Sequence, residues 1–261
     1  MKHLSDAAIH PLKTLLDEQL LRYNQQSFIA DDPISVPHRF NLKQDKEIAG
    51  FFAAIFAWGQ RRTIIHKTNA LMTIMDNAPY DFILHHRAKD LKCLMGFIHR
   101  TFNDTDLLYF VERLKNHYEE FESLEEAFCL NQREGMYERL KHFHQYFFAI
   151  DYPERTKKHI ATPERNSACK RLNMYLRWMV RSDDAGVDFG LWKRIRMNEL
   201  IIPLDTHTLF VANHLHLVQD KKANWQSAEA VTALFRSWCP EDPVKYDYAL
   251  FGLGLNRNTW L

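Results

Sequence analysis

The chain has 261 residues, of which 46% are hydrophobic and 26% charged, and its 34 lysines and arginines nearly balance 33 aspartates and glutamates. These proportions are typical of a globular protein with a sizeable core and exclude collagen-like and low-complexity chains. No run approaches the roughly 20 apolar residues of a membrane span, residues 1–6 lack the apolar stretch of a signal peptide, and four dispersed cysteines fit a reducing compartment. The sequence therefore predicts a cytoplasmic protein that does not contact a membrane.

Apolar residues recur at helical spacing through most of the chain, and no convincing β alternation or internal repeat interrupts them. A long loop is expected at residues 28–43, where Asp31-Asp32-Pro33 and Val36-Pro37 argue against a regular element. Ser123 to Glu126 has the form of a capping box, and Asp242 is expected to cap the last helix. Helices are predicted over residues 11–23, 45–58, 61–76, 105–118, 134–149, 166–181, 205–217, 227–238 and 243–252.

The predicted class is therefore all-α. We expect one compact two-lobed helical domain over residues 1–261, because the length suits one large domain or two small lobes. The first lobe would span about 45–160 and the second 161–261, with residues 1–44 as a candidate addition to the second.

Charge is unevenly distributed. Residues 104–126 hold eight acidic and two basic side chains, whereas residues 155–181 hold eight basic side chains and only Glu164 as an acid. A local excess of positive charge is what a phosphate-binding surface needs, since backbone contacts carry most nucleic-acid affinity. A solvated basic helix face explains the same pattern equally well.

Lys170 stands at the start of a predicted helix. Leu172 and Leu176 would face inward, while Lys170 would lie in the first turn. The positive end of the helix dipole and the neighbouring Arg171 both disfavour an ammonium charge there, and an uncharged lysine is an amine nucleophile. An ordinary surface lysine is the alternative.

Asp205 follows an apolar run that breaks at Pro203, and it is placed to cap the next helix, with Leu209 and Ala212 on its buried face. Such a cap contributes about 1 kcal/mol of stability, and a purely structural role is the alternative to a functional one.

Three stretches taken together resemble the helix-hairpin-helix DNA glycosylase superfamily. Lys170-Arg171-Leu172-Asn173 is similar to the family's lysine helix, and Pro203-Leu204-Asp205-Thr206-His207 is similar to its Pro-x-Asp-x-His motif. The early segment ending Trp58-Gly59-Gln60 looks like the family's first motif, in the right order. The resemblance covers roughly residues 45–255, and it extends to an uncharacterised bacterial family of similar length.

The sequence departs from the family's pattern at two places, and these departures indicate which branch it resembles. The family's hairpin usually carries Gly-x-Gly, whereas Pro163 to Ser167 contains no glycine. Thirty-five positions separate Lys170 from Asp205, which is longer than in most members. The archaeal 8-oxoguanine glycosylase branch has comparable features, and no four-cysteine cluster points to the iron–sulfur branch.

The resemblance implies a bifunctional DNA glycosylase and abasic-site lyase. A damaged nucleotide, with an oxidised purine such as 8-oxoguanine favoured, would be flipped out of double-stranded DNA. Lys170 would attack the sugar C1′ as the base leaves and form a Schiff base, and Asp205 would stabilise the developing positive charge. The protein would act as a monomer, associated with the nucleoid if bacterial, without a cofactor.

Further DNA- and base-binding residues follow from the same resemblance. Trp58 and Gln60 match positions that line the base pocket, although Trp58 could equally be core at a helix end. The hairpin side chains of Arg165, Asn166 and Ser167 would replace the glycine backbone contacts. Arg171 and His207 complete the predicted contacts. The 14 histidines match no tight ligand frame, so no metal site is predicted.

Two other functions remain open. A non-catalytic helical nucleic-acid-binding protein would use the same basic surface and would explain the missing hairpin glycines. A helical partner-binding module would show no salt-dependent affinity for DNA, unlike both other candidates.

Overall fold

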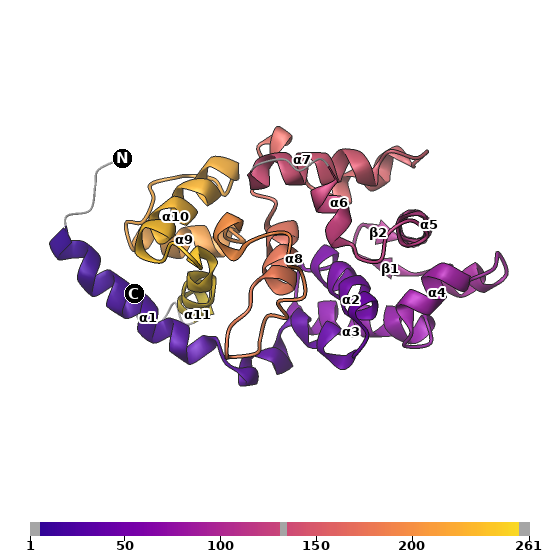
Figure 1. Ribbon diagram of the computed structural model, residues 1–261, viewed down its shortest axis with the longest axis horizontal. Helices are drawn as coiled ribbons and strands as arrows, with labels where there is room; N and C mark the ends of the chain where they lie inside the picture. Colours follow the sequence, from indigo (N-terminus) through magenta and orange to yellow (C-terminus); the bar gives the residue numbers. More distant parts are fainter. Residues whose placement is uncertain (1–5, 131–134, 256–261) are drawn as a thin grey trace. The chain divides into compact units, whose positions relative to one another are not determined.

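The computed structural model describes residues 6–130 and 135–255, whose regular structure is helical apart from one short hairpin (Figure 1). The all-α prediction is confirmed. The chain divides into two compact units, Ile29–Thr162 and the described residues of Met1–Phe28 with Pro163–Leu261. No helix among the described residues is long and apolar enough to cross a membrane. We call the two units the 29–162 unit and the terminal unit.

The 29–162 unit is built from helices around an antiparallel hairpin. The hairpin pairs Ile98 with Asn103 and His99 with Phe102. Its regular elements are α2 (Lys43–Ile55), α3 (Arg61–Ile74), α4 (Pro79–His85), β1 (Ile98–His99), β2 (Phe102–Asn103), α5 (Asp104–Tyr118), α6 (Glu125–Cys129) and α7 (Met136–Phe147), with 3-10 turns η4 (Asp90–Leu94) and η5 (Glu154–His159).

Phenylalanine fills the core of this unit. Phe51 of α2 stacks on Phe110 of α5 at 5.8 Å between ring centroids, and Phe110 meets Phe147 of α7 edge to face at 4.8 Å. All three rings are buried. Each buried ring contributes about 1.5–3 kcal/mol, so the predicted apolar stripes are what hold these helices together.

The capping box predicted at Ser123 does not form. α6 begins at Glu125, and the Ser123 hydroxyl donates to the buried carboxylate of Glu47 at 2.5 Å. The same carboxylate accepts the Tyr118 hydroxyl at 2.9 Å and the Leu124 N–H at 3.0 Å. A buried carboxylate needs such donors, and the hydroxyl of Ser123, which was expected to cap the helix, serves as one of them.

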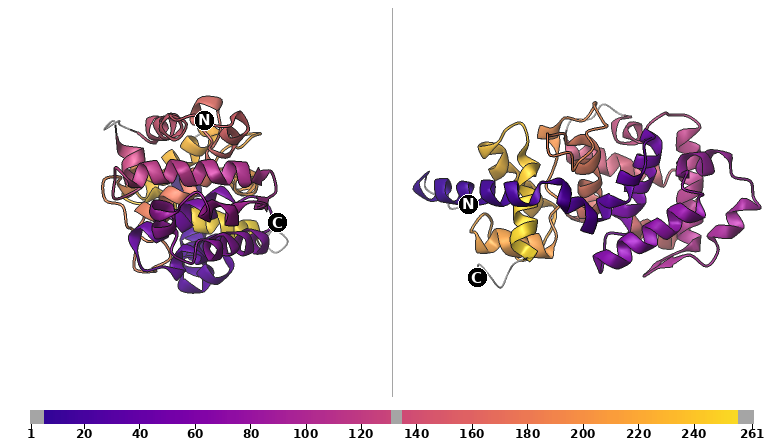
Figure 2. Two further views of the ribbon diagram at one scale, coloured as in Figure 1. Left: turned by 90° about the vertical axis from the view of Figure 1, so that its right-hand side faces the viewer. Right: turned by 90° about the horizontal axis from the view of Figure 1, so that it is seen from below.

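The terminal unit joins the two ends of the chain. α1 packs against α11, and Figure 2 shows the indigo helix lying along the yellow one. Gly252 of α11 permits this approach, because a Cβ there would overlap the ring of Tyr23. The elements of this unit are α1 (Asp6–Tyr23), η6 (Pro163–Arg165), α8 (Lys170–Val180), η7 (Met197–Glu199), α9 (Thr206–His214), α10 (Trp225–Trp238), η8 (Pro243–Tyr246) and α11 (Asp247–Leu255).

The prediction of an irregular loop at residues 28–43 is wrong in part. Three 3-10 turns occupy it: η1 (Gln26–Asp31), η2 (Pro33–Ser35) and η3 (Pro37–Arg39). Proline opens the last two because its fixed φ suits a first turn, and the Asp32 carboxylate accepts the Ile34 N–H at 3.1 Å.

Asp242 is not the predicted cap of the last helix. It precedes η8 without a side-chain cap bond, and its carboxylate accepts instead from Nε of Arg181. The charge of a buried guanidinium attracts a carboxylate more strongly than a backbone N–H does.

Candidate active site

Lys170 and Asp205 lie together in the terminal unit. Lys170 is the first residue of α8, and Asp205 is the N-cap of α9, as predicted for both. The Lys170 Nζ is 4.0 Å from Asp205 Oδ2, and the side chains are 29% and 36% exposed. Two residues thirty-five positions apart thus present an amine and a carboxylate at one partly open place.

The two oxygens of Asp205 have different partners. Oδ1 accepts the N–H groups of His207 and Thr208, both at 2.9 Å, and the Thr208 hydroxyl at 3.0 Å. Oδ2 faces Lys170. Burial raises the pKa of Asp205, but the Lys170 charge and the bonds from Thr208 and His207 outweigh it and lower the pKa overall. Asp205 is therefore a carboxylate at neutral pH, with one oxygen directed at the amine.

The segment before Lys170 makes a tight turn without glycine. η6 is followed by Asn166 at φ +55° and then by Cys169 at φ +48°, both in the left-handed region that glycine occupies most easily. Asparagine tolerates this conformation better than most residues. The Ser167 hydroxyl accepts the Cys169 N–H at 3.1 Å, and Ser167 pairs in an antiparallel bridge with Asn224.

The other predicted DNA contacts of this unit differ in exposure. Arg165 and Asn166 are exposed, and Ser167 is half-buried. His207 is exposed in the first turn of α9. Arg171 is half-buried, and burial lowers its pKa to about 10.

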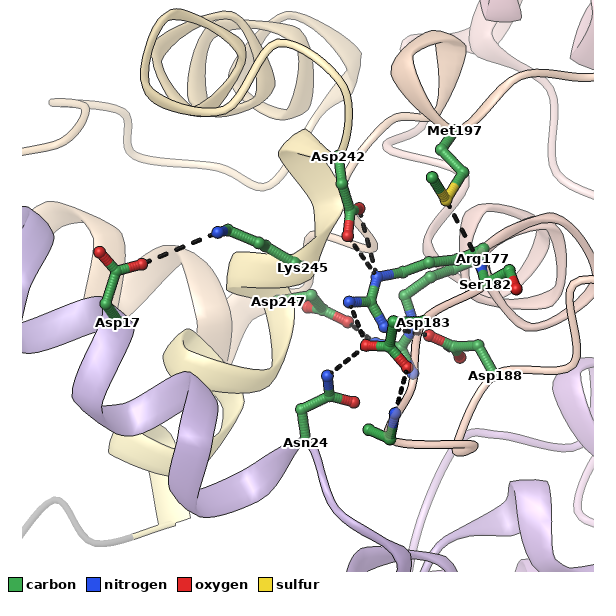
Figure 3. Close-up of polar contacts among 12 residues, drawn as sticks. Asp17, Asn24, Arg177, Ser182, Asp183, Asp188, Met197, Asp242, Lys245 and Asp247 are labelled. Carbon is green, nitrogen blue, oxygen red and sulfur yellow. Dashed lines mark hydrogen bonds and ion pairs between the residues drawn. The ribbon is translucent and has the colours of Figure 1, made fainter.

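A buried charge cluster lies along α8 from Lys170 inward. Arg177, two turns after Lys170, donates to Asp247 of α11, and its Nε is 3.3 Å from Asp188 Oδ1. Arg181 contacts three carboxylates, those of Asp183, Asp188 and Asp242. Figure 3 shows Asp183, Asp188, Asp242 and Asp247 gathered at this place. The sequence analysis did not identify this cluster.

Asp247 links the cluster to the candidate pair. Burial raises its pKa to about 6, the positive charges of Arg177 and Lys170 oppose this rise, and the negative charges of Asp205 and Asp188 add to it. Asp247 therefore lies within electrostatic range of both Lys170 and Asp205. The seven-residue spacing of Lys170 and Arg177, which places them on one helix face, is the sequence signal that could have indicated the connection.

The basic stretch 155–181 is divided between the two units, and three of its arginines pair with carboxylates. Its residues up to Thr162 belong to the 29–162 unit and the rest to the terminal unit. Arg155 is bonded to Asp106 Oδ2 at 2.6 Å, and Arg177 and Arg181 are buried among carboxylates. These three arginines balance internal charges, so the prediction that they face phosphate is wrong.

Trp58 and Gln60 belong to the 29–162 unit. α2 ends at Ile55, so Trp58 lies in the turn before α3, half-buried, with the Arg100 guanidinium 4.6 Å from its ring centroid. Gln60 is exposed at the N-cap position of α3 without a side-chain cap bond.

No group of three or more His, Cys, Asp and Glu side chains within 6–130 and 135–255 could hold a metal ion. A family model described as "Protein of unknown function (DUF2400)" matches residues 32–256. No curated protein and no solved structure matches the chain.

Proposed function

We propose that this chain, which belongs to the DUF2400 family, is a DNA glycosylase and abasic-site lyase that uses Lys170 as its nucleophile. The observation that carries the proposal is the 4.0 Å approach of the Lys170 amine to the Asp205 carboxylate. The resemblance of three stretches to the helix-hairpin-helix glycosylases supports the same assignment. The substrate would be double-stranded DNA with a damaged base, an oxidised purine being favoured, or an abasic site, bound by a monomer.

In the proposed reaction Lys170 acts as the free amine. Its nitrogen forms a bond to C1′ as the glycosidic bond breaks, and the electron pair of that bond leaves with the base, which takes up a proton. The nitrogen loses a proton, and the C1′–O4′ bond breaks with its electron pair on O4′, which takes up a proton, so that a protonated Schiff base forms. Water removes a proton from C2′, the bond between C3′ and the 3′ phosphate oxygen breaks with its electron pair on the phosphate, and hydrolysis of the imine frees the lysine.

Asp205 supports this sequence in two ways. Its Oδ2 lies 4.0 Å from the amine and orients it for attack, while the ammonium proton passes to solvent before the reaction. The negative charge that Asp205 keeps stabilises the positive charge that develops on the sugar as the base departs. Its low pKa holds it ionised throughout.

Around the pair, Arg165, Asn166 and Ser167 would bind phosphate from the turn before α8. The left-handed backbone of Asn166 gives this segment the kind of tight turn for which hairpins usually use glycine. His207 and Arg171 lie close in sequence to the pair. For Trp58 and Gln60, the resemblance alone supports a role in binding the base.

Borohydride trapping tests the proposal. Purified protein is incubated with duplexes containing 8-oxoguanine, hypoxanthine, an oxidised pyrimidine or an abasic site, and the reduced adduct is counted on a denaturing gel. We expect an adduct from the wild type and from Lys193→Ala, and none from Lys170→Ala. Lys193 is a suitable control because it lies in the same unit and its Nζ donates to the Gly190 carbonyl.

A Lys170→Ala variant that still forms the trapped imine would overturn the assignment. So would a wild-type protein that binds DNA and forms no adduct on any of the four duplexes. That second result would favour a non-catalytic nucleic-acid-binding protein, for which the existing ion pair is a specific argument, since a lysine held as an ammonium by Asp205 is not a nucleophile.

A further inference from the structure

The hairpin of the 29–162 unit exposes apolar and cationic side chains side by side. Met95 and Ile98 are 60% and 55% exposed, which is unusual for large apolar residues. Arg100 lies at the turn with its guanidinium over Trp58. We call Lys67, Met95, Ile98 and Arg100 the hairpin surface.

Two contacts bring α3 and the turn before it close to the hairpin. The Lys67 Nζ, in the middle of α3, is 5.9 Å from the ring centroid of Phe97, which lies in the chain between Met95 and Ile98. Arg100 also approaches Gly59, where a Cβ would collide with its guanidinium. Lys67 and Arg100 therefore lie near the exposed apolar residues of the hairpin, in the same unit.

Two hydrogen bonds to other parts of the 29–162 unit hold the hairpin in place. Arg155 donates from Nη2 to the Thr101 carbonyl at 2.9 Å, and the buried His99 ring bonds the Phe56 carbonyl at 3.0 Å. Arg100 holds φ +58°, a left-handed conformation that costs free energy for any residue with a Cβ. Such strain in a well-supported turn is typical of functional sites.

The carboxylate that follows the hairpin does not pair with the two cations of the hairpin surface. Asp104 is the acidic residue that follows it, and its carboxylate accepts the N–H groups of Gly96 and Thr105, both at 2.8 Å. Lys67 and Arg100 contact aromatic rings in place of carboxylates. A guanidinium over a half-buried ring is a modest interaction, so Arg100 can exchange this contact for a phosphate.

From these observations we propose that the hairpin surface binds the DNA duplex, with Lys67 and Arg100 on phosphates and Met95 and Ile98 on sugars and base edges. Cations at phosphates beside apolar side chains in a groove are a recurrent mode of DNA contact. The choice of DNA as the partner rests on the proposed function; the surface itself is separate from Lys170. It supplies a second DNA contact, carried by the other unit.

A salt titration tests the two cations. Binding to a fluorescent duplex with an abasic-site analogue is measured by anisotropy between about 50 and 200 mM salt. We expect Lys67→Gln/Arg100→Gln to lower the slope of log affinity against log salt by about 1.8, since each phosphate contact contributes about 0.9. The control Lys13→Gln/Lys193→Gln removes the same charge from the terminal unit and should keep the wild-type slope.

The apolar pair is tested separately. We expect Met95→Ser/Ile98→Ser to weaken binding about tenfold at every salt concentration and to leave the slope unchanged, because no ion is released by an apolar contact. Leu21→Ser/Leu42→Ser is the matched control, since these side chains are 79% and 48% exposed elsewhere. The control should bind as the wild type does.

The inference is overturned if both test variants keep the wild-type slope and affinity, or if the controls change them equally. Displacement of the duplex by poly-glutamate with no effect of the apolar variant would also overturn it and indicate an acidic protein partner. The Lys67→Gln/Arg100→Gln variant should still form the borohydride adduct at saturating protein. A wild type that binds steeply and never traps contradicts the proposed chemistry alone, so the two failures are distinguishable.

Discussion

Replacing Arg181 by methionine removes the buried guanidinium that ends α8. Its three guanidinium nitrogens lie 3.0, 2.7 and 2.9 Å from carboxylate oxygens of Asp188, Asp183 and Asp242, and the Arg181 side chain is 2% exposed. Methionine would fill much of the space but leave Asp183 and Asp242 without their arginine, and it would leave the fully buried Asp188 with Arg177 alone. Breaking a buried ion pair from one side costs about 3–5 kcal/mol, so we expect the free energy of unfolding to fall by about 4 kcal/mol.

Urea unfolding followed by circular dichroism at pH 7 measures this loss. Arg196→Met is the control, because the Arg196 side chain is 74% exposed beside Glu199 and its pair should contribute less than about 1 kcal/mol. Adding Asp242→Asn to Arg181→Met should restore part of the stability, since it removes a largely buried charge, 15% exposed, that has lost its arginine. A loss for Arg181→Met no larger than that of Arg196→Met would refute the reasoning.

Three further changes test other parts of the terminal unit. Asp205→Asn should keep the α9 cap and lose under about 0.5 kcal/mol, whereas Asp205→Ala should lose about 1–2 kcal/mol in urea unfolding; equal losses would contradict the cap. Because burial raises the pKa of Asp247 to about 6 from 3.8, its contribution to stability is present below about pH 4 and is lost as pH rises through 6. Between pH 5 and 7.5 the wild type should therefore lose about 1.4 kcal/mol relative to Asp247→Asn, and a pH-independent difference would count against the raised pKa. Gly252→Ala should cost about 1–3 kcal/mol by collision with Tyr23, while Gly254→Ala, whose Cβ would meet Val211 at an ordinary 3.7 Å, should not lower the melting temperature.

The sequence was sufficient wherever the signal is local. Asp205 precedes an apolar helical stripe, and this position predicted it as a cap. A second apolar stripe, with Leu172 and Leu176, predicted the helix that holds Lys170. Amphipathic spacing also predicted the long helices of both units. The short α4 escaped notice because seven residues hold too few turns for periodicity to appear.

The failures have a common physical cause, which is competition from residues distant in the chain. Asp242 fails to cap η8 because Arg181 captures its carboxylate, and the serine expected to cap α6 instead donates its hydroxyl to Glu47, a residue 76 positions away. A sequence window over the basic stretch contains the arginines and omits partners such as Asp247, so it cannot distinguish a phosphate-binding surface from buried ion pairs. The Arg100 turn over Trp58 likewise depends on contacts that no local pattern records.

The two oxygens of the Asp205 carboxylate have different partners, which restricts the substitutions that this position can accept. Oδ1 fastens the first turn of α9 while Oδ2 meets Lys170, and the short aspartate stem is what lets one group reach both. Glutamate would carry the charge away from the N–H groups, and serine would keep the cap and abandon the amine. Of these side chains only aspartate meets both constraints, so a substitution at position 205 gives up either the cap of α9 or the pairing with Lys170.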